Sequence, residues 1–370
     1  METPLLNEEW EVLASLLPEG WQALARETGA MRRTRRITDP AILLQVILLH
    51  AATGLSLKQA AARAQAQGLA TISDVALLKR LRSSGNWLRE LSCRMFAQSR
   101  FSGLPGHMSG ERRLRAVDAT TVQEPGATGT DWRVHYSICI PEMRCDFYQI
   151  TDTSGGETYK RIPVMPGDIL LGDRGYCHRE GVAHVVSQKG DVVARLNSTS
   201  FPLLNSKGGC FHILRHLRQL EGTSSGEWVT YFEASGKRLR GRLCAIRKSR
   251  VAADRAKLKI QREAAKRKTL VRPETLESAE YIYVFTTLDS KTAGTTDILD
   301  LYRARWQIEL CFKRLKSLLQ LGHVPKRSDD SAHAWIEAKL LTVLMIEALL
   351  NQARLFSTWG YTLTPPQPLA

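Results

Sequence analysis

The segment of residues 166–176 constrains the fold more than any other part of the chain. Its sequence, PGDILLGDRGY, is a short apolar run that is bounded by Pro-Gly on one side and by Gly on the other. Such a run is typical of a strand that is buried inside a parallel sheet. The helix-like HREGVAHVVSQKG and the strand-like DVVARLN follow it, so this part of the chain predicts an α/β domain.

Further strand-like segments lie on both sides of this run. RLRAVDATTV, WRVHYSICI and CDFYQITD precede it, and YIYVFTTL returns at residues 281–288. The stretch between them, residues 199–282, is poor in strand signals, contains many Gly and Ser residues and becomes very basic. Strands, an interruption, and then one more strand with two long helices predict one α/β domain that carries an insertion.

Positive charge is concentrated in one window. The 370 residues include 52 Lys and Arg against 37 Asp and Glu, which gives a formal net charge of +15. The window from Lys237 to Lys268 holds 14 Lys and Arg against Asp254 and Glu263, and so carries +12 of that charge. A nucleic-acid backbone is the commonest partner that neutralises such a stretch. A solvated basic surface helix is the alternative.

The first 105 residues are predicted to be helical. The run Leu55–Gln67 breaks at Gly68, and Ser73 is a candidate N-cap for the helix that follows. A helix, a short turn and a helix with basic residues are compatible with a DNA-binding helix-turn-helix, and equally with an ordinary small bundle. The basic cluster MRRTRR, residues 31–36, lies in the same region.

Several protein classes are disfavoured by what the sequence contains. The longest apolar runs, near residues 41 and 340, are shorter than the roughly 18 uncharged residues of a membrane span. The N-terminus lacks the pattern of a secretion signal. The seven cysteines are scattered without a CxxC pair, and no P-loop is present. We therefore expect a cytoplasmic protein that has no membrane partner and does not use ATP.

Residues 302–316, YRARWQIELCFKRLK, predict an amphipathic helix with a polar edge. At about 100° per residue, four polar side chains share an arc of about 60°, beside an apolar stripe: Tyr302, Arg305, Glu309 and Lys316. An ordinary surface pair of Arg305 and Glu309 is one reading. A phenol and two cations around one carboxylate also favour a divalent metal at Glu309, with donors along a phosphate backbone.

Two earlier carboxylates have suitable settings. Asp118 ends the apolar run Leu114–Val117, and Asp173 ends the run Ile169–Gly172. A carboxylate at the end of a buried strand can lie in a site at the edge of the sheet. For either residue alone, a turn-initiating Asp is the better reading. Three carboxylates from two strand ends and one helix, however, suit a hard cation such as Mg²⁺.

Taken together, these motifs resemble the bacterial insertion-sequence transposases of the Asp-Asp-Glu type. The matching motifs are VDATTV, LLGDRGY and the helix pattern Tyr302-x2-Arg305-x3-Glu309-x6-Lys316. This helix pattern is similar to that of the insertion-sequence-four group. Asp118 and Asp173 are 55 residues apart, and Asp173 and Glu309 are 136 apart. The second gap is longer than a ribonuclease-H-like core requires, and in this group a mostly β insertion domain fills it.

The resemblance implies an α/β chain with a ribonuclease-H-like catalytic core that is interrupted by an insertion. The expected parts are an N-terminal helical DNA-binding domain (1–105), the catalytic core (106–198 and 283–350), a β-rich basic insertion domain (199–282) and a C-terminal tail (351–370).

The resemblance also implies the chemistry of a transposase. Asp118, Asp173 and Glu309 would bind two Mg²⁺ or Mn²⁺ ions, at which DNA is cut at the terminal inverted repeats of the element. The freed 3′-OH would then be transferred into target DNA. A homodimer in the synaptic complex, and a location in the bacterial cytoplasm with the nucleoid, are further expectations from the family.

Eight residues are predicted to contact DNA or to lie next to it. Four belong to the polar helix edge, namely Tyr302, Arg305, Trp306 and Lys316, and four to the basic window, namely Arg255, Lys257, Lys259 and Arg262. Trp306 could stack on an unpaired base or pack against the insertion domain. Five other acids in the region are predicted to be turn or surface residues: Asp131, Asp146, Asp152, Glu157 and Asp168.

Two alternatives to a transposase stay open on the sequence. One is a catalytically silent DNA-binding relative that inhibits active enzymes, against which the intact Asp118, Asp173 and Glu309 argue. The other is a ribonuclease-H-like nuclease that only hydrolyses DNA. The basic insertion and the basic N-terminal domain favour the binding of DNA ends over simple hydrolysis.

Overall fold

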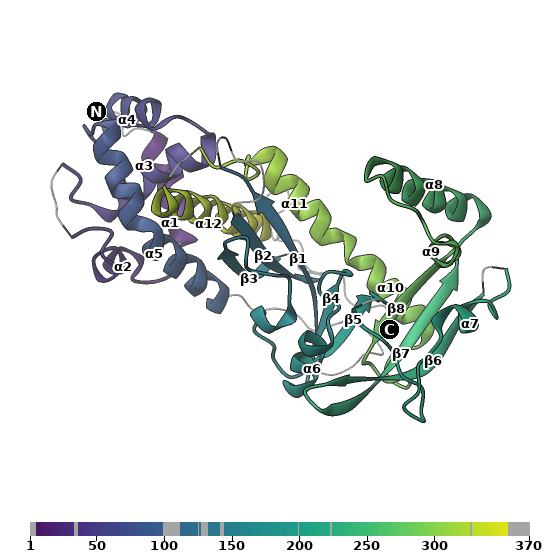
Figure 1. The fold of residues 1–370 in the computed structure, drawn as a ribbon. Helices are drawn as coiled ribbons and strands as arrows, with labels where there is room; N and C mark the ends of the chain where they lie inside the picture. The colour runs from purple at the N-terminus through teal and green to yellow at the C-terminus, as the bar shows by residue number, and fades with distance from the viewer. Residues whose placement is uncertain are drawn as a thin grey trace.

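A helical bundle and a mixed β-sheet make up the part of the chain that the computed structural model describes (Figure 1). The described residues are 5–32, 36–98, 112–124, 126, 132–140, 144–198, 200–222, 224–325 and 328–353. The predicted α/β class is confirmed. None of the helices in these ranges is long and apolar enough to cross a membrane.

The N-terminal region is helical, as the sequence predicts. Its helices are α1 (Leu5–Ser15), α2 (Trp21–Glu27), α3 (Pro40–Thr53), α4 (Leu57–Ala66) and α5 (Asp74–Gln98). Ser56 caps α4 in a capping box with Gln59, and the Ser73 hydroxyl accepts the Ala76 amide at 3.3 Å at the start of α5. The predicted cap at Ser73 is therefore confirmed.

Eight described strands form one sheet in the order β3-β2-β1-β4-β5-β8-β7-β6. The strands are β1 (Arg113–Val122), β2 (Trp132–Ile140), β3 (Arg144–Thr151), β4 (Asp168–Gly172), β5 (Asp191–Arg195), β6 (Ser225–Ala234), β7 (Lys237–Arg247) and β8 (Tyr281–Thr286). The pairs β1–β4 and β4–β5 are parallel, and the other pairs are antiparallel. Every residue of β4 is buried, as the apolar run predicts.

The insertion differs from its prediction. Residues 199–282 contain α7 (Ile213–Leu217), α8 (Arg250–Lys266) and α9 (Pro273–Ser278) besides β6 and β7, so the segment is mixed and not mostly β. Its strands also extend the main sheet, because β7 pairs with β8 and β8 pairs with β5. The sequence did not predict β7, because basic residues interrupt its apolar residues and weaken the strand pattern. One of them, Arg242, is buried and donates to the Leu288 and Ala293 carbonyls.

The last helix returns to the N-terminal bundle. After α6 (Arg179–Ser187), α10 (Thr295–Ala304) and α11 (Trp306–Leu318), helix α12 (Asp329–Ala353) packs along α5 and also contacts α3 and β3. One hydrophobic core therefore runs from the bundle through α12 to the sheet, with Leu43, Leu88, Val134, Ile169 and Ile336 among its buried members. The predicted boundary at residue 105 lies outside the described residues, as does most of the predicted tail, and α12 continues past residue 350 to Ala353.

Candidate active site

Asp118 and Asp173 lie at the same edge of the sheet, on neighbouring strands. The parallel pairing of β1 with β4 covers Arg113–Ala116, so Asp118 comes two residues after the pairing ends. Asp173 directly follows β4. The prediction that Asp118 ends its strand is wrong, because β1 continues to Val122 in antiparallel pairing with β2. The pairing of β1 with β4 ends before Asp118, at Ala116. The two strands separate there, and both carboxylates lie at the point of separation.

Asp118 is a mostly buried acid with a shifted pKa. The pKa of Asp118 is raised to about 7, first by burial and then by the negative charges of Asp173 and Glu157. The Ala119 amide, which donates to Asp118 at 2.8 Å, and the positive charge of Arg305 oppose the shift. A cation bound beside Asp118 would favour its ionised form.

Asp173 is also a turn residue, as the sequence predicts for this residue taken alone. Its Oδ1 accepts the amides of Gly175 at 2.7 Å and of Tyr176 at 3.2 Å, which fixes the turn after β4. Within the described residues, no donor is bonded to its Oδ2. The turn thus holds the carboxylate rigidly and leaves one oxygen for a ligand.

Glu157 is a third carboxylate at this edge, and the sequence prediction placed it at the surface. A Cβ on Gly175 would meet both the Glu157 carboxylate and Asp173 Oδ1, so the two acids lie together against this glycine. Burial raises the pKa of Glu157, and the charge of Asp173 raises it further. Glu157 follows a Gly-Gly pair in a loop, and nothing in its spacing from the other acids could have revealed it.

The remaining acids of the region fall into three classes. Asp146 and Asp168 were expected at the surface, but both pair with the buried Arg115, at 2.5 and 2.9 Å. They neutralise a cation inside the core and are not available as ligands. Asp152 is an exposed turn residue that accepts the Ser154 amide, as predicted. Asp131 lies outside the described residues.

The predicted helix of residues 302–316 is divided at Arg305. Helices α10 and α11 meet there, and the hydrogen bonds across the junction span three residues: Arg305 donates to the Tyr302 carbonyl and Ile308 donates to the Arg305 carbonyl, both at 3.2 Å. The prediction of one unbroken helix is therefore wrong. Arg305 has helical dihedral angles (φ −54°, ψ −33°), so α11 follows α10 without a turn between them.

Arg305 connects this helix pair to the sheet edge. Its guanidinium pairs with Glu309 at 2.5 Å and lies 5.6 Å from the centre of the Tyr302 ring. The side chain of Arg305 is only 14% exposed, against 55% for Glu309. An ordinary surface pair would expose both partners. The positive charge of Arg305 also lowers the pKa of Asp118, so this cation lies near enough to act on both Asp118 and Glu309.

The residues at the edge partly fit a divalent cation. Asp118, Asp173 and Glu157 offer the oxygen donors that hard cations prefer, and the mutual repulsion of these acids would be relieved by a positive ion. Glu309, by contrast, is held by Arg305. Among the residues that the structure describes, no three Asp, Glu, His or Cys side chains are grouped closely enough to hold one ion.

Three cations that the sequence analysis did not single out lie at the same edge. Arg174 follows Asp173, Arg195 ends β5 and Lys248 follows β7. Burial lowers the pKa of Arg195, and the charge of Arg174 lowers it further. Burial, Arg195 and Arg174 likewise lower the pKa of Lys248. These residues are distant in sequence, so only the sheet topology brings them together.

The other predicted DNA contacts lie on exposed surfaces. Trp306 is 51% exposed, and Lys316 is exposed near the end of α11. Arg255, Lys259 and Arg262 are exposed on α8, which stands away from the sheet in Figure 1. At about 100° per residue these three share one stripe of α8 with Lys266.

Lys257 differs from its neighbours on α8. It points to the opposite side of the helix and pairs with Glu280 at 2.6 Å. Its charge is therefore already neutralised by the protein. The basic window thus presents a stripe of exposed cations of which Lys257 is not a part.

Comparison with known proteins supports the family that the sequence motifs resemble. Residues 145–345 match the family model described as a transposase DDE domain. The chain is 32% identical over 354 residues to the transposase for insertion sequence element IS421 of Escherichia coli, covering 93% of this chain and 95% of that protein. InsL of insertion sequence element IS186A, from Escherichia coli strain K12, is 32% identical over 353 residues with the same coverage.

A solved structure is similar at a much greater distance. The cryo-EM structure of the piggyBac transposase synaptic complex with hairpin DNA matches with a TM-score of 0.49 and 9% sequence identity, covering 98% of this chain and 78% of that one. Such a likeness is too remote to assign roles to residues.

Proposed function

This chain belongs to the DDE transposases of bacterial insertion sequences, and from that premise we propose how its own residues cut and join DNA. The proposed reaction is metal-dependent cleavage at the ends of the element, followed by transfer of the 3′-OH into target DNA. The observation that carries this proposal is the meeting of Asp118 and Asp173 at one sheet edge, beside the Arg305–Glu309 pair.

The topology supports a ribonuclease-H-like catalytic core. In the order β3-β2-β1-β4-β5, the first three strands are antiparallel and the next two are parallel to β1. The two aspartates lie where the paired strands β1 and β4 separate. We assign β6, β7 and α8 to the insertion and α3–α5 to recognition of the terminal inverted repeats, with a homodimer holding both ends.

The metal site is proposed to contain two Mg²⁺ or Mn²⁺ ions held by Asp118, Asp173 and Glu309. Such ions supply activation of the attacking oxygen and stabilisation of the leaving 3′-oxygen. For Glu309 to join the two aspartates, its 2.5 Å pair with Arg305 has to loosen. Arg305 then becomes free to donate to a phosphate, so one exchange of partners would complete both the acidic site and the phosphate contact.

The Tyr302 phenol and the cations of the edge are proposed to hold the DNA backbone near the cut. Tyr302, Arg305 and Lys316 belong to the helix pair, and Arg174, Arg195 and Lys248 add three positive charges from the sheet side. Lys248 donates to the Ala279 carbonyl, whereas Arg195 forms no ion pair with a described carboxylate. A phosphodiester would offset the mutual repulsion of these cations.

A strand-transfer assay tests the function directly. Purified protein is mixed with Mg²⁺, a plasmid and a labelled duplex that carries the inverted repeat flanking the reading frame and ends in a free 3′-OH. The proposal expects the label to become covalently joined to the plasmid. A protein that only nicks the duplex would be a hydrolytic nuclease, and one that binds the duplex without any product would be a silent inhibitor. Either outcome would contradict the proposal.

A further inference from the structure

His135 and Tyr176 are two completely buried residues behind the sheet edge that carries Asp118 and Asp173. The Tyr176 hydroxyl lies 3.3 Å from Nδ1 of His135, and Nε2 of His135 lies 3.1 Å from the Thr151 hydroxyl. Hydrogen bonds thus join three side chains, which come from the turn after β4, from β2 and from β3. The proposed metal ligands and DNA contacts include none of these three side chains.

The pair ties the turn at Asp173 to the rest of the sheet. The ladder between β1 and β4 ends before the two aspartates, so this strand pairing does not hold them at a fixed distance. Tyr176 belongs to the turn that follows β4, and its amide donates to Oδ1 of Asp173 at 3.2 Å. His135 lies on β2 next to Tyr136, which is opposite Asp118 in the pairing of β1 with β2. The bond between the tyrosine and the histidine therefore connects the turn of Asp173 to the strands that hold Asp118.

The pair lies on the other face of the sheet from Asp118. Neighbouring residues of a strand point to opposite faces, and residues opposite each other in two paired strands point to the same face. Asp118 and Tyr136 therefore both face α11, where the Tyr136 ring centre lies 5.8 Å from that of Phe312. His135 points to the opposite face, where it meets Tyr176. From there the pair can act on a ligand at the sheet edge only through the turn.

Both members of the pair are neutral, which suits a support for a cation site. The pKa of His135 is lowered to about 4, first by burial and then by the positive charges of Arg161 and Arg133. Burial raises the pKa of Tyr176, and the negative charges of the acids at the edge, Glu157 first, raise it further. A neutral imidazole donates from one ring nitrogen and accepts at the other, so it can link two hydroxyls. The pair therefore supports the turn without a positive charge that would oppose a metal ion.

Tyr159 is a matched neighbour that lacks such a bond. Its ring centre lies 5.4 Å from that of Tyr176, it is equally buried, and its hydroxyl has no hydrogen-bond partner among the described residues. Gly172, the last residue of β4, gives both rings their space, because a Cβ there would collide with the Tyr159 hydroxyl and lie 3.1 Å from Cβ of Tyr176. Packing under the turn is therefore common to both tyrosines, whereas the bond to β2 distinguishes Tyr176.

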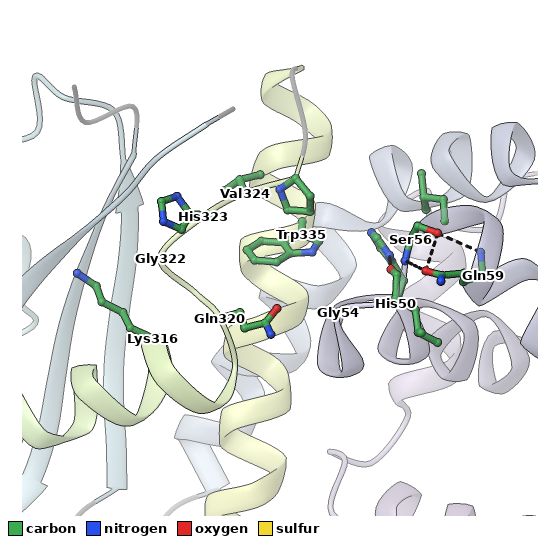
Figure 2. A pocket seen from close by; sticks show the side chains of 13 residues that line it. His50, Gly54, Ser56, Gln59, Lys316, Gln320, Gly322, His323, Val324 and Trp335 are labelled. Carbon is green, nitrogen blue, oxygen red and sulfur yellow. Dashed lines mark hydrogen bonds between the residues drawn. The ribbon is translucent and has the colours of Figure 1, made fainter. Parts of the chain in front are cut away.

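The cavity at the end of α11 does not lead to the pair. This cavity, of about 1010 Å³, lies between α11 and the N-terminal bundle, and Figure 2 shows Lys316, Gln320 and Trp335 in its walls. Neither His135 nor Tyr176 is among the described residues that line it. Since both side chains are also completely buried, they are suited to hold other groups in place and not to touch DNA.

We propose that His135 and Tyr176 are positioning residues of the metal site. The hydrogen bond between them sets the distance between the carboxylates of Asp118 and Asp173. This rests on the proposed function, in which the two aspartates bind Mg²⁺ or Mn²⁺. Without the bond, the turn after β4 can shift relative to β1, and the two carboxylates no longer meet at one ion. Removal of a residue that orients metal ligands typically weakens metal binding by about 10- to 100-fold.

Binding of Mn²⁺ to the full-length protein without DNA tests the proposal independently of activity. The dissociation constant is obtained from a titration in which free Mn²⁺ is measured by electron paramagnetic resonance. Tyr176→Phe keeps the ring and loses the hydroxyl, so it should weaken Mn²⁺ binding about tenfold. Tyr159→Phe removes the neighbouring hydroxyl and should bind Mn²⁺ as tightly as the wild type. Equal affinities of the wild type and Tyr176→Phe would overturn the proposal.

Two substitutions of His135 separate its two hydrogen bonds. The amide of an asparagine reaches the position of Nδ1, whereas the amide of a glutamine reaches the position of Nε2. His135→Asn should therefore keep the bond to Tyr176 and most of the Mn²⁺ affinity. His135→Gln keeps only the bond to Thr151 and should weaken Mn²⁺ binding as Tyr176→Phe does. Equal losses in the asparagine and glutamine variants would overturn the proposal.

The double variant Tyr176→Phe/His135→Gln tests whether the two residues act as one unit. It should bind Mn²⁺ no more weakly than either single variant, because both substitutions remove the same bond. Two losses that add would mean that each residue acts alone, and this would overturn the proposal.

Failure of the pair and failure of the metal site give different results. Asp118→Asn and Asp173→Asn each remove a proposed ligand and should lose the Mn²⁺ binding of the wild type. If both bind Mn²⁺ as the wild type does, the proposed metal site is wrong, and the positioning role is wrong with it. If the aspartate variants lose binding while Tyr176→Phe and His135→Gln lower only the melting temperature without metal, the metal site stands and the pair is merely structural.

Discussion

The sheet edge around Asp118 and the helix α8 both concentrate charge, but they hold it in opposite ways. At the sheet edge, acids and cations are partly buried and act on one another, as the charges of Asp173 and Arg305 act on Asp118. On α8, the cations stand on an exposed stripe, and Ala253 is the one buried residue of this fully described helix. Buried charges depend on one another, whereas exposed charges contribute independently and are screened by salt.

The comparison predicts very different responses to single substitutions. One change at a proposed metal ligand of the sheet edge should stop the reaction, because no neighbouring group takes over the role of a lost ligand. One change on α8 should alter affinity only slightly, because its neighbours provide the same contact to the backbone. The following predictions are arranged from the largest expected effect to the smallest.

The largest effect is expected at the proposed metal ligands. Asp118→Asn, Asp173→Asn and Glu309→Gln each remove a charged ligand with little change in volume, so each should abolish Mg²⁺-dependent nicking while DNA binding is largely retained. Nicking of an end-labelled duplex and a gel-shift assay measure the two properties side by side.

Glu157 provides the matched control for this prediction, since it lies at the same edge but outside the family pattern. Glu157→Gln should slow nicking without abolishing it. If Glu157→Gln abolishes nicking and Glu309→Gln does not, then Glu157 is the third ligand and Glu309 serves only as the partner of Arg305.

The sequence predicted those residues of this sheet edge that are marked by a local sequence pattern, and missed those that only the tertiary fold brings there. The end of β4 and the turn at Asp173 were predictable because a short apolar run and a following Asp-Arg-Gly carry the signal locally. Glu157, Arg195 and Lys248 were not, because only strand order brings them to the edge. The junction at Arg305 was also hidden, since its residues have helical periodicity on both sides.

The same reasoning applies to the fold. The N-terminal helices and the cap at Ser73 follow from local patterns, and they were predicted. The packing of α12 on α5 was not, because an apolar helix does not show in its sequence which partner covers it. Strand β7 was also not predicted, because it contains charged residues such as Arg242. Arg242 can be buried there because carbonyls of distant residues, Leu288 and Ala293, accept its hydrogen bonds.

A smaller and additive effect is expected on α8. Replacing Arg255, Lys259, Arg262 and Lys266 by Ala should weaken binding to all DNA sequences alike and should flatten the salt dependence by about one unit per lost phosphate contact. Lys257→Ala serves as the control, because Lys257 is paired with Glu280 and should leave the slope unchanged. An unchanged slope in the fourfold variant would show that α8 is only a solvated surface helix.

Trp306 should affect the steps that follow nicking and not nicking itself. It is 51% exposed at the start of α11, so its indole is available to stack on a base. Trp306→Ala should permit nicking but slow the later steps about tenfold, in line with a stacking energy of roughly 1–3 kcal/mol. A duplex that is already unpaired beside the cut should restore part of the rate. A parallel loss of melting temperature and of every activity would instead show that the indole stabilises the fold.

The smallest predicted effect concerns the stability of the fold, and it has a defined sign. Asp118 has a pKa of about 7 in the folded protein against 3.8 as its ordinary value. The unfolded chain therefore loses this proton first, and the buried acid lowers stability increasingly as the pH rises from about 4 to about 7. Asp118→Asn removes this cost, so its melting temperature should exceed that of the wild type by a few degrees at pH 8, and the difference should vanish near pH 4. Mg²⁺ should raise the melting temperature of the wild type more than that of the variant, because a cation favours the ionised acid. Asp152→Asn, at an exposed turn, should show no such gain. If Asp118→Asn melts below the wild type at pH 8, the carboxylate is held by the fold for structural reasons, and the contrast between the sheet edge and α8 loses its basis.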